Sequence, residues 1–335
     1  MKPFIRIDNP TSKDNDLIQT ELKSGKEVIL QFASKTYTDK VLADINTLCY
    51  KCDESLCIRF YGHTSKLFDC KTLLKIPNVK CLYIDCMQDV LNLDVLRELA
   101  HLKVLSLGIF NMRDMEILDS DNLRNLVGLF ISDTRSKVFN LDYLRKFKEL
   151  KSLRIAGHTK NIDAIGELTE LNALSLNSVK KVPVAFVNRL KYLKSLRFVL
   201  GSRENLNEIE ENQIENLDVT WVRGFDDLSC ISKFTKLKCL KVENEIQLLE
   251  IRFDNVFPFL TDLKIINCRS LATVDGVNNL PSLESLVIYQ TNIDFDKFVE
   301  QKFPDTLKTL GFYTTKVKID KVIKETLENK GYYCM

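Results

Sequence analysis

The sequence predicts an α/β solenoid, in which short parallel strands on one face alternate with helical or 3₁₀ return segments on the other. Two observations lead to this fold class. A six-residue pattern, L-x-x-L-x-[LIF], recurs thirteen times between residues 27 and 312, at intervals of 21 to 26 residues. Between the copies, apolar residues recur every three positions, as they do in tight helical turns. Because one such unit cannot bury its own apolar face, we expect each unit to pack on its neighbours.

The first expected element is an N-terminal cap over residues 1–26. A solenoid exposes apolar core at each open end unless a terminal element covers it. Leu17, Ile18 and Leu22 are spaced to share one helix face, with Ser12 as the candidate N-cap and Gly25 as the stop. We therefore expect an amphipathic helix over residues 12–24.

The repeat array is expected over residues 27–315, with about 13 parallel strands. Side chains alternate along a strand, so the central leucine of each copy points into the core. The return segments follow the strands, as at residues 162–171 and 228–237, where apolar residues recur every three positions. The central leucines are Leu30, Leu56, Leu82, Leu105, Leu129, Leu153, Leu174, Leu196, Leu217, Leu240, Leu263, Leu286 and Leu310.

The last expected element is a C-terminal helical cap over residues 316–335. Val322, Ile323 and Leu327 supply the inward face, and Gly331 follows as a stop. With both ends covered, we expect one structural domain overall.

The repeats resemble those of leucine-rich-repeat proteins, in particular the short bacterial and SDS22-like class. The resemblance covers roughly residues 27–315. It implies a curved horseshoe whose parallel strands line a concave face, with short helical or 3₁₀ segments on the convex face. It also implies a function as a non-enzymatic protein-protein interaction scaffold that binds a protein partner through the concave face.

The sequence departs from this family in its turns. The family usually has Asn five residues after the central leucine, and none of the thirteen positions here is Asn. We therefore expect irregular turns. Thr134, Cys268, Thr291 and Thr315 are expected to substitute in part for the missing amide, whereas Met87, Phe110, Val179 and Glu245 are not.

The alternation along each strand also predicts which side chains face a partner. These positions carry mixed charge, five basic and four acidic residues, together with large aromatic groups. Aromatic residues and arginine are enriched at the energetic centres of protein interfaces. Arg154, Arg197, Trp221, Lys241 and Lys264 are expected to form one patch. The full set of candidate binding residues is Tyr83, Phe130, Arg154, Arg197, Trp221, Lys241, Lys264 and Tyr289.

Two lysines in this set are expected to lie side by side on neighbouring strands. Like charges in that arrangement repel by roughly 0.2 to 1 kcal/mol. Glu243 and Asp262 could offset the repulsion of Lys241 and Lys264, and so could an acidic patch on a protein partner.

Composition argues against two classes of partner. The chain has 335 residues, with 48 basic and 46 acidic side chains and a formal charge of +2. Nucleic acids and anionic membranes attract proteins mainly through a basic excess, so neither is expected. The N-terminus lacks the apolar run of a signal peptide, and the chain has no apolar stretch long enough to span a bilayer. We therefore expect a cytoplasmic protein.

The ten cysteines are expected to be thiols rather than disulfides in a reducing cytoplasm. Cys49-x-x-Cys52 has the spacing of half a zinc site, but no second pair completes the four ligands that a structural site needs. We interpret the cysteines as small apolar core residues and expect no metal and no cofactor.

The sequence contains no recognisable catalytic motif. It lacks phosphate-binding loops, Gly-x-Ser-x-Gly and His-Glu-x-x-His, and its three histidines, His63, His101 and His158, lie on different repeats. We expect no catalytic residues and no enzymatic activity. Three more specific hypotheses stay open: an adaptor, an inhibitor or immunity-type protein that neutralises a toxin or enzyme, and a secreted internalin-like effector or adhesion protein. A site built between repeats would revive an enzymatic role.

Overall fold

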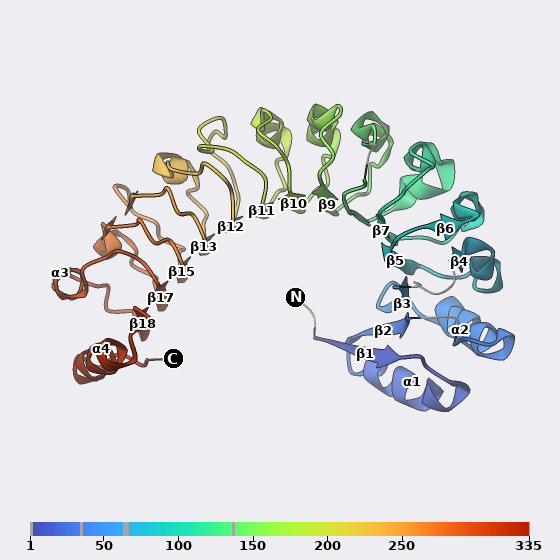
Figure 1. Cartoon of the computed structure of the whole chain (residues 1–335), viewed down its shortest axis with the longest axis horizontal. Coiled ribbons are helices and arrows are strands. Elements are labelled where there is room, and N and C mark those ends of the chain that lie inside the picture. Colours follow the sequence, from blue (N-terminus) through green and yellow to red (C-terminus); the bar gives the residue numbers. More distant parts are fainter. Residues whose placement is uncertain (1–2, 34–35, 63–66, 136–137, 335) are drawn as a thin grey trace. The chain divides into compact units, whose positions relative to one another are not determined.

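The computed structural model describes residues 3–33, 36–62, 67–135 and 138–334. The chain divides into two compact units, 1–171 and 172–335. In each unit, parallel strands lie on the inner side and short 3₁₀ helices on the outer side (Figure 1). The expectation of one structural domain overall stays a prediction.

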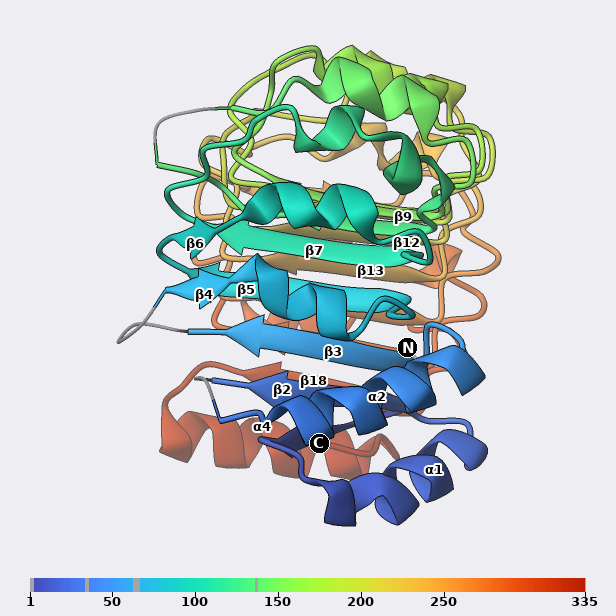
Figure 2. The ribbon, with the colours of Figure 1, turned by 90° about the vertical axis from the view of Figure 1, so that its right-hand side faces the viewer.

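On its inner side, unit 1 has seven parallel strands in its described residues, each paired with the next along the sheet. In Figure 2, β3, β5 and β7 lie side by side and point the same way. The strands are β1 (Phe4–Asp8), β2 (Glu27–Phe32), β3 (Leu56–Tyr61), β5 (Cys81–Met87), β7 (Val104–Ile109), β8 (Gly128–Ile131) and β9 (Ser152–Ala156).

Unit 2 also has seven parallel strands in the part of the chain that is described, paired in chain order. They are β10 (Ala173–Asn177), β11 (Ser195–Val199), β12 (Asn216–Thr220), β13 (Cys239–Glu243), β15 (Asp262–Ile266), β17 (Ser285–Tyr289) and β18 (Thr309–Tyr313). All thirteen predicted repeats therefore contain a strand. The fourteenth strand, β1, lies in the segment expected to be a cap.

The return segments are mostly 3₁₀ helices, as the three-residue spacing predicts. In unit 1 they are Ser12–Asp14, Cys70–Lys75, Leu93–Glu98, Ile117–Asp119, Asp121–Asn125, Leu141–Lys146 and Ile162–Glu167. In unit 2 they are Ala185–Arg189, Ser229–Lys233 and Val277–Asn279. Two small parallel pairs lie outside the main strands: β4 (Phe68–Asp69) with β6 (Val90–Leu91), and β14 (Glu250–Arg252) with β16 (Thr273–Asp275).

The four α-helices lie at or near the two ends of the repeats. They are α1 (Asn15–Lys23), α2 (Asp39–Lys51), α3 (Phe295–Val299) and α4 (Val317–Asn329). Helix α2 was not expected from the sequence, and its Leu42, Ile45 and Leu48 are buried. None of the helices in the described residues has the length and hydropathy to cross a membrane.

Both terminal helices bury a narrower face than expected. In α1 only Ile18 is buried and Leu17 is 47% exposed; in α4, Ile323 and Leu327 are buried and Val322 is 61% exposed. Adjacent helix residues point about 100° apart, so Leu17 and Ile18 cannot share a narrow face. The N-cap prediction is also wrong. Thr11, not Ser12, caps the first turn, in a reciprocal box with Asp14.

Leucines form the core of each unit in register from strand to strand. Leu105, Leu129 and Leu153 are aligned in unit 1 and are at most 1% exposed. Burying a leucine fully contributes about 1.5 to 3 kcal/mol, so such a row is a main source of stability. The predicted register is wrong in one repeat. Ile58, not Leu56, aligns with Leu30 and Leu82, so the pairing of β3 is shifted by two residues from the predicted one.

Candidate functional site

The inner face of unit 1 presents one side chain from each strand between two buried positions. Along neighbouring strands, Arg59, Tyr83, Ser106, Phe130 and Arg154 follow one another in register. This row contains three of the predicted binding residues and places them on the face that the sequence pattern predicts.

Tyr83, Phe130 and Arg154, which we call the unit 1 cluster, contact one another across the strands. The Tyr83 and Phe130 rings meet edge to face, with their centroids 6.1 Å apart. Ser106 lies between them in register, and its small side chain leaves room for the contact. The Arg154 guanidinium lies 5.5 Å from the Phe130 ring centroid and has no carboxylate partner among the described residues. The cluster is an aromatic surface with an exposed cation at its edge.

Arg59, in contrast, is neutralised on the same face. Its Nε donates to Asp85 Oδ1 at 2.9 Å, and its Nη1 donates to Gln31 Oε1 at 3.0 Å. A guanidinium held in this way contributes rigidity to the face more than net charge.

Most of the predicted cations of unit 2 are also paired. Arg197 Nε lies 3.0 Å from Asp218 Oδ2 on the neighbouring strand, and Lys241 forms an ion pair with Glu243. Lys264 lies beside Lys241 in register and has no ion pair within the described ranges. Lys264 is therefore the predicted unit 2 lysine whose charge stays available.

Asp262 forms no ion pair with Lys241 or Lys264 within the described residues, so its expected offset of the lysine charges stays a prediction. Its Oδ2 accepts a hydrogen bond from Thr261 Oγ1 at 2.7 Å. Tyr289 lies at the end of β17, 37% exposed, with its ring centroid 6.4 Å from that of Tyr313. Because Arg154 lies in unit 1 and the other four patch residues lie in unit 2, the single patch stays a prediction.

Trp221 lies directly after β12, at a position that recurs in unit 2. In six successive repeats the residue after the strand, the strand-end residue, has left-handed backbone: Ser178, Leu200, Trp221, Asn244, Asn267 and Gln290, with φ between 51° and 60°. This conformation aims each N–H at the last carbonyl of the next strand, as Trp221 N does at Glu243 O, 2.9 Å away. The expectation of irregular turns is therefore wrong for these strand ends.

Leu200 and Trp221 are unusual occupants of this position. Left-handed backbone suits Gly and Asn, and for bulky residues it costs of the order of 1 to 3 kcal/mol. Both side chains are nonetheless exposed, 47% for Leu200 and 58% for Trp221, so little burial compensates for the cost. Such strain often marks a functional site.

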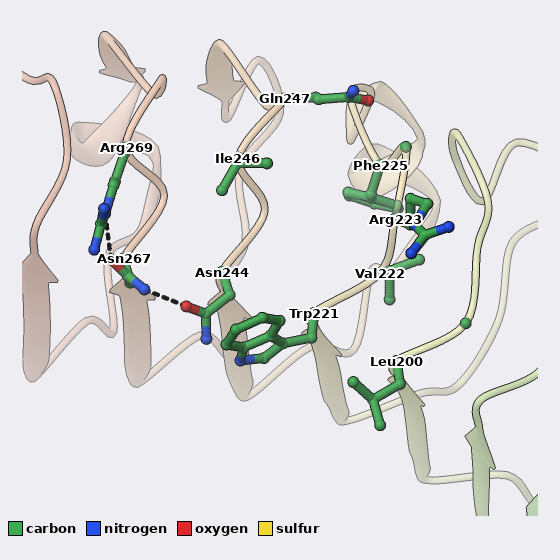
Figure 3. A pocket seen from close by; sticks show the side chains of 12 residues that line it. Leu200, Trp221, Val222, Arg223, Phe225, Asn244, Ile246, Gln247, Asn267 and Arg269 are labelled. Atoms are coloured by element: carbon green, nitrogen blue, oxygen red, sulfur yellow. Dashed lines mark hydrogen bonds between the residues drawn. The ribbon is translucent and has the colours of Figure 1, made fainter.

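A cavity of about 510 Å³ opens beside these two residues (Figure 3). It lies at the ends of strands β11 to β15 and is lined by apolar, amide and cationic side chains. We call it the strand-end cavity. Its lining includes Leu200, Trp221, Arg223, Asn244, Ile246, Gln247, Asn267 and Arg269.

A chain of hydrogen bonds orders the polar side of this cavity. Arg269 Nε donates to Asn267 Oδ1 at 2.9 Å, and Asn267 Nδ2 donates to Asn244 Oδ1, as Figure 3 shows. The acceptor atoms of both amides are thereby used within the chain. Asn244 Nδ2, the indole N–H of Trp221 and the remaining Arg269 N–H groups have no partner within the described residues, so the cavity offers donors in excess.

Two buried side chains take over the turn position where the family has Asn. Glu245 Oε1 accepts the N–H of Val222 at 2.9 Å, so the prediction that Glu245 cannot serve this turn is wrong. This single hydrogen bond satisfies the Val222 N–H. The other oxygen, Oε2, is buried with no partner within the described ranges, and burial raises the pKa of Glu245 to about 7. Cys268 substitutes in part, as expected, through Sγ contacts with the Val242 and Ile266 carbonyls.

His158 has the same turn role in unit 1. Its Nδ1 accepts the Phe139 N–H at 3.2 Å, so Nε2 carries the proton and donates to Ser132 O at 2.9 Å. The ring is 1% exposed, and burial lowers its pKa. His158 therefore joins adjacent turns. Of the other histidines, His101 is exposed and His63 lies outside the described residues.

The ten cysteines are free thiols, and seven of them are buried. Burial raises the pKa of Cys49 and of Cys70 to about 12, so both stay protonated at neutral pH. Within the described ranges, no three His, Cys, Asp or Glu side chains are grouped to hold a metal ion.

Sequence reasoning missed most of the strand-end cavity. It singled out Trp221 but not Leu200, Asn244, Ile246 or Arg269. One sequence signal was available: a bulky or amide residue lies four positions after the central leucine in five successive repeats, from Leu200 to Gln290.

Solved structures of two bacterial proteins are similar to this chain. An internalin from Listeria monocytogenes has a TM-score of 0.53 and 17% sequence identity, over 92% of this chain and 79% of the internalin chain. A leucine-rich-repeat protein from Leptospira interrogans has a TM-score of 0.50 and 17% identity, over 97% of this chain and 92% of that one. No family model and no curated protein matches the sequence.

Proposed function

Because the chain has the leucine-rich-repeat fold, we propose that it is a non-enzymatic scaffold that binds a protein partner through the inner face of its strands. The observation that carries this proposal is the unit 1 cluster. Tyr83, Phe130 and Arg154 are large groups on the face opposite the core, and they contact each other instead of filling it. Aromatic residues and arginine are enriched among the few residues that carry most of the binding energy at protein interfaces.

The state of the ionisable side chains favours binding over catalysis. A nucleophile or general base needs a pKa tuned towards neutrality in an accessible cleft. Here burial moves the thiols of Cys49 and Cys70 away from that range. Glu245 has a pKa of about 7, but it is 1% exposed and accepts a backbone N–H in a turn.

The proposal is tested by affinity capture from the native cell with the tagged full chain as bait. The test variant is Tyr83→Ala with Phe130→Ala and Arg154→Glu. The matched control carries Tyr143→Ala and Arg124→Glu, both within outer 3₁₀ segments of the same unit. We expect a stoichiometric protein that the wild type and the control capture and the test variant loses. Equal capture by all three folded proteins would contradict binding through this face.

An acidic patch on the partner is part of the proposal. The support is Lys264, whose charge is not used in an ion pair within the described residues and which lies beside Lys241. The double variant Lys241→Glu, Lys264→Glu is expected to weaken binding of the captured partner at least tenfold. Unchanged affinity would remove the acidic patch from the proposal.

We also propose a cytoplasmic location. Seven of the ten cysteines are buried as free thiols, which suits a reducing compartment. Cell fractionation with thiol labelling of the denatured protein tests this: reduced cysteines in the cytoplasmic fraction are expected, and recovery from the medium would contradict it.

A further inference from the structure

We propose that the strand-end cavity of unit 2 binds a short extended peptide segment in which an acidic residue lies three to five residues from an aliphatic or aromatic one. This inference rests on the proposed function and specifies one ligand segment for a second surface, separate from the unit 1 cluster.

The positive charge of the cavity is the reason to expect an acidic residue in the ligand peptide. The lining contains two arginines, Arg223 and Arg269, and no carboxylate. Neither guanidinium forms an ion pair within the described residues. The two acids that flank Asn244 in the sequence are already engaged: Glu243 pairs with Lys241, and buried Glu245 accepts the Val222 N–H. A ligand carboxylate would meet uncompensated positive charge, with the planar geometry that guanidinium groups bind in a bidentate manner.

The hydrogen-bonding groups of the cavity are mainly donors, so they favour a ligand peptide that is rich in acceptors. Asn267 Oδ1 accepts from Arg269, and Asn267 Nδ2 donates to Asn244 Oδ1, so Asn244 Nδ2 has no acceptor within the described residues. The Trp221 indole N–H is a second donor without an acceptor in the described part of the chain. Peptide carbonyls and a carboxylate supply the acceptors that these groups lack.

The exposed apolar side chains of the cavity favour an aliphatic or aromatic residue in the ligand peptide. The length of the cavity favours an extended peptide. Leu200, Trp221 and Ile246 are 47%, 58% and 63% exposed around the cavity. From the β11 end to the β15 end the cavity crosses three strand spacings of about 4.8 Å, or roughly 14 Å. An extended chain rises about 3.3 Å per residue, so four to five residues cover that distance. An apolar residue over Leu200 and Trp221 thus places an acidic residue three to five positions away, near Arg269.

The backbone strain is consistent with this assignment. Asn244 and Asn267 adopt the left-handed backbone with little conformational strain. Leu200 and Trp221 adopt it with more strain, and their side chains stay exposed. Large apolar groups held at this position pre-form a hydrophobic contact surface, and a rigid aromatic side chain loses little entropy on binding.

The test begins with a random heptapeptide library displayed on phage and selected on the immobilised full-length chain. We expect the enriched sequences to pair Asp or Glu with an aliphatic or aromatic residue three to five positions away. A selected peptide, capped at both ends, is then measured by fluorescence anisotropy. Arg269→Glu and Trp221→Ser are each expected to raise Kd at least tenfold. The matched control, Arg252→Glu, lies on the separate strand β14, and its Kd is expected to stay within twofold of wild type.

A second comparison isolates the acidic contact. Changing the acidic residue of the peptide to its amide is expected to weaken binding about tenfold in the wild type and less than twofold in Arg269→Glu. No enriched motif, a motif without an acidic residue, or equal binding by the folded variants would overturn the inference. These outcomes are separate from the capture test. If the unit 1 variant loses its partner while no peptide binds here, the proposed function holds and this inference fails.

Discussion

Glu245 Oε1 accepts the backbone N–H of Val222 at 2.9 Å, while Oε2 of the same carboxyl is buried with no partner among the described residues. A side-chain amide at this turn could satisfy both a donor and an acceptor. The carboxyl satisfies one group and carries the cost of desolvation when it ionises. The turn of this repeat is therefore stabilised by a group that prefers to be neutral.

The first prediction concerns the pH dependence that this carboxyl produces. Burial raises the pKa of Glu245 to about 7, above the value of about 4.5 in the unfolded chain. Between these two values the folded state holds a proton that the unfolded state does not. The contribution of Glu245 to stability is thus fully present below about pH 4.5 and is lost as the pH rises through 7. Glu245→Gln is expected to raise Tm at pH 8 by several degrees and to have a smaller effect at pH 5.

Thermal unfolding of the wild type and Glu245→Gln at both pH values checks this. Glu210→Gln, at an exposed position of the same unit, serves as the control and is expected to leave Tm within about a degree at either pH. If Glu245→Gln changes Tm equally at pH 5 and pH 8, the carboxyl does not titrate as described.

The second prediction concerns His158, which should respond to pH in the opposite direction. Burial lowers its folded-state pKa below the unfolded value of 6.5. Below pH 6.5 the unfolded chain gains a proton before the folded chain does, so this residue destabilises the fold as the pH falls. Protonation would also remove Nδ1 as the acceptor of the Phe139 N–H.

Replacement of His158 separates its two roles. His158→Ala leaves the Phe139 N–H and the Ser132 carbonyl unpaired, and is expected to cost about 2 to 4 kcal/mol at pH 8. The variant should lose less stability than the wild type between pH 7 and pH 5. Urea unfolding at these pH values measures both effects, and exposed His101→Ala is the control. A cost below 0.5 kcal/mol for His158→Ala would show that neither hydrogen bond stabilises the turn.

The third prediction tests the left-handed strand-end backbone directly. Asn244 has φ of 59°, which Gly adopts freely and β-branched residues avoid. Asn244→Val should therefore destabilise unit 2 by at least about 1 kcal/mol more than Asn244→Gly. Asn216, exposed at the start of β12, is the matched position: there Val is expected to be the better tolerated residue, because it suits extended backbone. The same order at both positions in urea unfolding would argue against a left-handed conformation at Asn244.

The sequence was sufficient to predict the strands because the pattern reports a core that every repeat must build. Leu105, Leu129 and Leu153 are buried by the same geometry, so one spacing identifies all three. The predicted register was wrong at Leu56 because Leu56 and Ile58 are both apolar and fit the same alternation. Only the pairing of the strands distinguishes the two residues.

The candidate site was less predictable, since it depends on pairing rather than on pattern. Residue types correctly placed Tyr83, Phe130 and Arg154 on the inner face, but they did not show that Asp218 neutralises Arg197. The strand-end cavity depends on backbone conformation, which residue type indicates only where Gly or Asn occurs. The left-handed backbone of Leu200 therefore could not be predicted from its residue type.

The fourth prediction concerns Gly201, which follows Leu200 and lines the strand-end cavity. Its φ is 81°, and a Cβ at this position would overlap the carbonyl oxygen of Val179. That oxygen accepts the Ser202 N–H at 3.2 Å, so it cannot move away without breaking a turn hydrogen bond. Gly201→Ala is expected to destabilise unit 2 by at least about 3 kcal/mol, from backbone strain and overlap together.

Gly224 provides the control for the overlap. It lines the same cavity with φ of 85°, but a Cβ there would have no neighbour closer than the Arg203 carbonyl oxygen at 3.8 Å. Gly224→Ala carries the strain of the left-handed backbone without a collision, and should cost only about 1 to 2 kcal/mol. Urea unfolding of the two variants compares them directly. Equal costs would mean that the Val179 carbonyl can yield, and that the turn beside Leu200 is less rigid than its contacts indicate.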